Sequence, residues 1–175
     1  MWGKVKNFYS PWIDVCSFLI LIITVFYSIY YYTQLPDEIP THFNLAGEPD
    51  AWNGKGTLIG FLVLYVFLLF QCFGLNYFLF IKQEDPKEAL HFINLPFVKK
   101  EKLTETQLDR VVKYSSRMLA VMNLCISILF AFILYGMIQT AIGNRNGLGS
   151  IIIIVVVLLV GVSIYYIWKM YREVK

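Results

Sequence analysis

The stretch IDVCSFLILIITVFYSIYYY, residues 13–32, is an apolar run of 20 residues near the start of the chain. An α-helix rises about 1.5 Å per residue, so about 20 residues cross the hydrocarbon core of a bilayer, which is about 30 Å thick. The run ends in three tyrosines and has no small-residue cleavage site, which distinguishes it from a secretory signal peptide. We therefore predict a retained membrane-spanning helix.

Three further apolar runs follow, at residues 57–81, 117–141 and 150–168. None of the four runs has a charge in its interior. Hydrophobic residues make up 58% of the chain and charged residues 15%, whereas soluble domains are about half apolar and about a quarter charged. The sequence predicts an all-α polytopic membrane protein, a four-helix transmembrane bundle that forms a single membrane domain over residues 1–175.

Lysine and arginine are distributed unevenly among the segments that join these runs. Both terminal tails and the loop at residues 82–116 are basic, whereas the loop at residues 33–56 contains only Lys55 and the last turn only Arg145. Short cytoplasmic loops retain Lys and Arg. We predict cytoplasmic termini, a cytoplasmic basic loop at 82–116 and an outer loop at 33–56. The net charge of +3 follows from this topology and does not indicate nucleic-acid binding.

Two polar patterns predict helix starts. Asp85 followed by Pro86 is typical of an N-cap with a first-turn proline. Thr104 and Gln107 fit a capping box, in which each side chain bonds the other residue's backbone N–H. No helix breaker separates this box from the third apolar run. We predict one long helix from Glu105 to about Ala141.

Asn76 and Asn123 lie at similar depths in the second and third runs. Side-chain amides inside a membrane form hydrogen bonds between helices, and each such bond stabilises the packing by about 1 kcal/mol. We predict an interhelical polar contact between them that serves helix packing, because the ionisable residues that usually mark a transport pathway are missing. The fourth run has few polar side chains and is expected to face lipid over most of its surface.

The outer loop carries the residues with the most evident chemistry. Its prolines restrict the backbone and Gly47 suits a turn with φ > 0, so we expect an ordered cap. His42, Glu48 and Asp50 would be adequate ligands for Zn²⁺ or Mn²⁺ if they converged. Alternatively, they form a hydrogen-bonded scaffold or a recognition surface, and Lys55 pairs with Asp50 or faces headgroups. The candidate recognition residues are Pro40, His42, Phe43, Gly47, Glu48, Asp50, Trp52 and Lys55.

One pattern in this loop resembles a known family; it comprises Leu35-Pro36, Pro40-Thr41-His42-Phe43, Gly47, Pro49-Asp50, Trp52 and Lys55. It is similar to a bacterial four-span membrane domain of unknown function, also found at the N-terminus of SdpI-like immunity proteins against a sporulation-delaying toxin. The resemblance implies an integral protein of the bacterial cytoplasmic membrane. Some relatives give immunity to a secreted peptide toxin, or sense that toxin and sequester a repressor, and the resemblance implies a role of this kind.

Three functions remain open from the sequence. The leading hypothesis is a non-enzymatic membrane protein whose outer loop recognises a peptide toxin or cell-surface component, while Lys82–Arg117 contacts anionic lipid or a cytoplasmic protein. The second is a membrane enzyme or transporter component that uses His42, Glu48 and Asp50 as metal ligands or acid–base groups. The third is a structural accessory subunit. The motifs GxxxxGK[ST], HExxH and GxSxG are absent, and we expect no cofactor.

Overall fold

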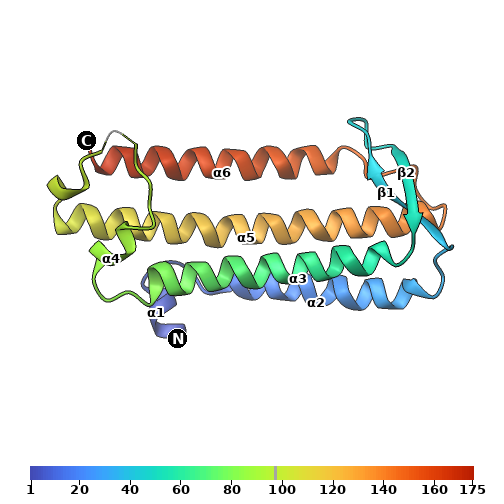
Figure 1. Cartoon of the computed structure of the whole chain (residues 1–175), viewed down its shortest axis with the longest axis horizontal. Coiled ribbons are helices and arrows are strands. Elements are labelled where there is room, and N and C mark those ends of the chain that lie inside the picture. Colours follow the sequence, from blue (N-terminus) through green and yellow to red (C-terminus); the bar gives the residue numbers. More distant parts are fainter. Residues whose placement is uncertain (97) are drawn as a thin grey trace.

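Four long helices dominate the computed structural model, which describes residues 1–96 and 98–175 (Figure 1). They are α2 (Trp12–Tyr32), α3 (Thr57–Asn76), α5 (Glu105–Ala141) and α6 (Ile151–Glu173), and the π-helical segment η1 (Tyr77–Ile81) continues α3. All four are long and apolar enough to cross a membrane. The structure is 68% helical. The predicted helical fold with four candidate membrane spans is therefore confirmed.

The central helix is α5, which packs against α2, α3 and α6. Helix α6 packs chiefly on α5, and Figure 1 shows it on the other side of α5 from α2 and α3. Only 6% of the apolar window of α6 is buried, and side chains such as Ile154, Val157 and Ile164 are exposed. In a bilayer these side chains would contact lipid, which agrees with the expectation for the fourth run.

Both predicted helix starts are formed. Asp85 caps the short helix α4 (Pro86–Leu90) by accepting a hydrogen bond from the backbone N–H of Lys87 at 2.8 Å. The capping box of Thr104 and Gln107 is present at the start of α5. Because α5 has 37 residues and is thus about 55 Å long, it extends beyond the thickness of a bilayer core.

The two chain termini lie at the same end of the bundle, which we call the terminal end (Figure 1). Two short helices near this end were not predicted, α1 (Trp2–Lys6) and η2 (Lys100–Lys102). The N-terminal segment brings Val5 and Tyr9 against Ile81 and Ala120. The chain before α2 is therefore packed onto the bundle rather than extended. Phe97, in the predicted basic loop, lies outside the described residues.

At the opposite end, the segment between α2 and α3 forms a β-hairpin, and we call this the hairpin end. Strand β1 (Glu38–Phe43) pairs antiparallel with β2 (Pro49–Gly54), with register shifts on both sides of His42. The Asn44 side chain accepts hydrogen bonds from the backbone N–H groups of Ala46 and Glu48 at 2.9 and 3.0 Å. The turn predicted at Gly47 is present, with φ of 81°. The strands themselves were not predicted.

The hairpin is docked on the helices by its base. Ile39 and Pro40 are fully buried, in a core that continues into the helices. This core also contains Leu35, Leu58, Tyr65, Leu69, Leu134, Met137 and Ile138. Packing among these side chains holds β1 against α5, so the hairpin is part of the packed structure.

The turn between α5 and α6 also contacts the hairpin, at the hairpin's own turn. The backbone N–H of Leu148 donates to the carbonyl oxygen of Gly47 at 2.9 Å. At this crossing the two backbones are so close that a Cβ on Gly147 would lie 2.0 Å from the same oxygen. Only glycine fits there, and the two loops consequently form one cap over the hairpin end.

Candidate functional site

His42 on β1 and Asp50 on β2 form a pair on the exposed side of the hairpin. The register places His42 opposite Ala51, and His42 Nδ1 lies 2.5 Å from Asp50 Oδ1. Both side chains are open to solvent, with exposed fractions of 70% and 42%. An exposed pair of this kind adds little to stability. Its main effect is to fix the orientation of the imidazole, whose Nε2 has no hydrogen-bond partner among the described residues.

Glu48 does not join this pair. Its Oε2 accepts a hydrogen bond from the side-chain amide of Asn44 at 3.2 Å, at the tip of the hairpin. Across residues 1–96 and 98–175, no group of three or more His, Cys, Asp or Glu side chains is placed to hold a metal ion. The structure therefore brings together two of the three candidate metal ligands, His42 and Asp50, as a hydrogen-bonding pair.

Other predicted site residues divide between the base and the surface of the hairpin. Pro40 is buried, and Phe43 is partly buried against the core. Trp52 stands opposite Pro40 in the register, yet 47% of it is exposed. Leu45, at the tip, is 99% exposed and was not predicted as a site residue. The hairpin thus packs its base toward α5 and carries two large exposed apolar side chains, one in the turn and one on β2.

Lys55 contacts Asp37 at the base of the hairpin. Its Nζ lies 3.3 Å from Asp37 Oδ1, and its backbone N–H donates to the Asp37 carbonyl oxygen at 2.8 Å. Of the two roles expected for Lys55, pairing with Asp50 is not formed, since Asp50 pairs with His42. Lys55 therefore closes the base of the hairpin rather than contributing to the exposed pair.

The predicted hydrogen bond between Asn76 and Asn123 is not formed, although both buried residues are described. Asn76 Nδ2 donates to the Ser116 carbonyl oxygen at 3.0 Å, and Asn76 Oδ1 accepts from Ser116 Oγ at 2.7 Å. Asn123 Nδ2 donates to the Leu69 carbonyl oxygen at 3.4 Å. In this antiparallel register the two amides lie about two helical turns apart along α5. Each is an interhelical contact with its own partner.

Asn76 also belongs to a buried polar network that includes Asp14, near the start of α2. Tyr9 donates its hydroxyl to Asp14 Oδ2 at 2.8 Å, and the Tyr9 oxygen accepts from Asn76 Nδ2 at 3.3 Å. Burial, followed by the charge of Asp14, raises the pKa of the Tyr9 phenol well above its usual value, so the phenol keeps its proton. The network continues to Ser116 and links the N-terminal segment and α2 with α3 and α5.

Asp14 was not predicted as a functional residue because it stands second in the first apolar run. Boundary residues of a span usually reach the headgroups, but Asp14 is only 8% exposed. The sequence feature that could have identified Asp14 is that no other Asp or Glu falls within the four apolar runs. An ionisable residue inside a span is by default a candidate functional group.

One comparison with known proteins gives a match, and the matched segment includes the hairpin. The family model of a domain of unknown function (DUF1648) matches residues 19–69, which contain most of α2, the whole hairpin and most of α3. The match supports the predicted resemblance to a membrane domain of unknown function. No curated protein and no solved structure matches the chain. The relation to SdpI-like immunity proteins stays a prediction.

Proposed function

We propose that this chain is a non-enzymatic integral protein of a bacterial cytoplasmic membrane, SdpI-like in function. Its hairpin recognises an extracellular peptide toxin or a cell-surface component, and the protein serves immunity or sensing. The observation that carries the proposal is the exposure of large apolar side chains on the hairpin. Leu45 and Trp52 are 99% and 47% exposed, and the hairpin also carries the exposed His42–Asp50 pair.

The physical chemistry of this surface supports recognition of a peptide. Exposed aromatic and aliphatic side chains supply apolar contact area, while an oriented imidazole–carboxylate pair supplies specific hydrogen bonds. The packed base of the hairpin reduces the conformational entropy lost on binding. Strand β1 packs on α5, whereas β2 makes its main contacts with β1. The outer edge of β2 could therefore pair with an extended peptide.

The charge distribution supports the orientation in this proposal. All 15 Lys and Arg residues fall within the described part of the chain, and of these only Lys55 and Arg145 lie at the hairpin end. The exposed cations at the terminal end include Lys82, Lys87 and Lys102. With this end in the cytoplasm, each cation near an anionic leaflet adds about 1 kcal/mol of attraction, so the basic segment contacts lipid or an acidic cytoplasmic protein.

The orientation predicts which sites can be labelled from outside the cell. In a variant with Cys16, Cys72 and Cys125 replaced by Ser, Leu45→Cys is expected to react with a membrane-impermeant maleimide in intact cells. Glu84→Cys, at the terminal end, is expected to react only after permeabilisation. The reversed pattern would contradict the proposed topology.

The recognition role predicts a phenotype for changes that leave the fold intact. Deleting the gene is expected to sensitise cells to at least one member of a panel of secreted antimicrobial peptides. His42→Ala with Asp50→Ala, and separately Leu45→Ser, are expected to reproduce that sensitivity at unchanged protein level, because these side chains add little to packing. Growth inhibition and immunoblots on the same cultures provide the two measurements.

The matched control is Glu38→Ala, which removes an exposed carboxylate at the base of the hairpin and is expected to retain full resistance. If the deletion strain responds like its parent to every peptide in the panel, the immunity role is wrong. If the deletion strain is sensitive but the hairpin variants are not, recognition resides elsewhere in the protein.

A further inference from the structure

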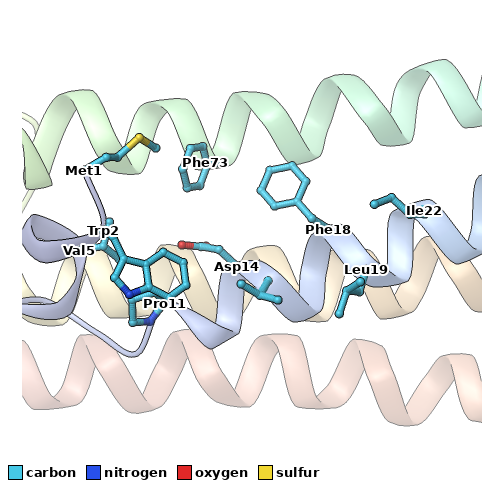
Figure 2. Close-up of a pocket in the computed structure, with 10 residues that line it drawn as sticks. Met1, Trp2, Val5, Pro11, Asp14, Phe18, Leu19, Ile22 and Phe73 are labelled. Atoms are coloured by element: carbon cyan, nitrogen blue, oxygen red, sulfur yellow. The ribbon is translucent and has the colours of Figure 1, made fainter.

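A cavity of about 460 Å³ opens at the terminal end between α1, α2 and α3. Its lining includes Trp2, Val5, Phe18, Ile22 and Phe73, and the lining is apolar apart from Asp14. Figure 2 shows the Asp14 carboxyl group between Phe18 and Phe73 on one side and Trp2 on the other. A space of this size is within the usual range for small-molecule sites, about 300–1,000 Å³.

Only one of the two carboxyl oxygens of Asp14 accepts a hydrogen bond from a described residue. Its Oδ2 accepts the hydrogen bond from Tyr9 at 2.8 Å, but no described residue donates to Oδ1. The ion pairs among the described residues do not include Asp14. A buried carboxylate without a cation is unfavourable in apolar surroundings. The cavity therefore combines an apolar wall with one carboxyl oxygen that no described residue engages.

We propose that this cavity binds a cationic amphiphile, a small molecule with one ammonium or guanidinium group on a hydrocarbon or aromatic body. The cation pairs with Asp14 Oδ1, and the body lies along the apolar wall. The rings of Trp2, Phe18 and Phe73 add cation–π attraction at the same position. A single carboxylate matches a single positive charge, so an anionic lipid is excluded and a neutral chain leaves Asp14 unpaired.

The network around Asp14 connects this site with the helix packing. A bound cation would fix the position of the Asp14 carboxyl group, which accepts a hydrogen bond from the Tyr9 hydroxyl. The Tyr9 oxygen in turn accepts a hydrogen bond from the Asn76 side chain. Ligand binding therefore favours the arrangement in which the N-terminal segment is packed on α3 and α5. The site lies at the opposite end of the bundle from the hairpin, so it does not rest on the proposed recognition function.

The test is equilibrium binding of radiolabelled dodecyltrimethylammonium to the protein in nanodiscs of phosphatidylcholine, with empty nanodiscs subtracted. This probe carries a permanent charge, so the pH of the buffer does not alter it. We expect saturable binding with one site per chain. Asp14→Asn keeps the shape of the side chain and is expected to weaken binding by about tenfold or more, because a charge-assisted contact is lost. Uncharged 1-dodecanol is expected to compete poorly.

Glu84→Gln is the matched control, since it removes the same charge from an exposed position at the terminal end outside this cavity. It should bind like the wild type. Equal binding by Asp14→Asn, equal competition by dodecanol or no saturable binding would each overturn the proposal. If Asp14→Asn does not fold, Val15→Phe provides the test instead. This variant fills the cavity and leaves the Asp14 carboxyl group in place, so it is expected to lose binding of the probe. Retained binding by a folded Val15→Phe also overturns it.

Discussion

Replacing Gly147 with alanine is expected to lower the free energy of unfolding by about 3 kcal/mol. Gly147 has φ of 143°, a conformation that L-residues with side chains rarely adopt. Its new Cβ would lie 2.0 Å from the Gly47 carbonyl oxygen and 3.0 Å from the Gly47 carbonyl carbon. Both are backbone atoms, so the strain is relieved only by separating the hairpin from the α5–α6 turn. The midpoint of thermal unfolding in detergent measures the effect.

Gly161→Ala provides the control for this experiment. Gly161 is in the middle of α6, and a Cβ there would meet no atom within 4 Å beyond its chain neighbours and the nearby backbone of its own helix. Because alanine is the better helix former, this variant is expected to gain up to about 1 kcal/mol. If Gly147→Ala and Gly161→Ala unfold at the same temperature, the tight crossing of the two loops is not a feature of the folded protein.

The second large effect is expected at Asn76, whose replacement by leucine should cost about 1.5 kcal/mol. The change removes three hydrogen bonds and leaves the Ser116 hydroxyl and the Tyr9 oxygen without those partners in a buried setting. Apolar packing cannot compensate, since leucine is no better solvated between helices than in lipid. Unfolding by a denaturing detergent, followed by circular dichroism, provides the measurement.

Gln71→Leu is the matched control, because Gln71 is an exposed amide on the same helix. Its replacement is expected to be neutral or mildly stabilising in a bilayer. A double variant, Asn76→Leu with Ser116→Ala, should lose less than the sum of the single losses, since both changes disrupt the same contact. Strict additivity would show that the Asn76–Ser116 contact contributes no coupling energy.

These two predictions concern opposite ends of one helix bundle. At the hairpin end, Gly147 lies against the backbone of the hairpin turn at Gly47 and Glu48, so its replacement should also impair the recognition proposed for the hairpin. At the terminal end, Asn76 supports Tyr9 and through it the Asp14 carboxyl group. Its replacement is therefore also expected to weaken binding of the cationic probe, whereas hairpin variants should not affect that binding.

The sequence by itself determined the elements whose cause is local. Helical length and apolar composition define the four spans, because any stretch of about 20 apolar residues can satisfy its backbone in a bilayer only as a helix or within a barrel. The capping box of Thr104 and Gln107 placed the start of α5 correctly, since its hydrogen bonds join residues close in sequence. The turn at Gly47 was predictable for the same reason.

Only the tertiary structure decided which distant residues meet. The partners of Asn76 and Asn123 depend on the register of α3 against α5, and similar depth in a membrane does not fix that register. Packing of the N-terminal segment buries Asp14 under Tyr9 rather than leaving it at the headgroups. The pairing of His42 with Asp50, without Glu48, required a hairpin register that the prolines and Gly47 do not specify. Such contacts follow from packing between segments, for which the local pattern carries no signal.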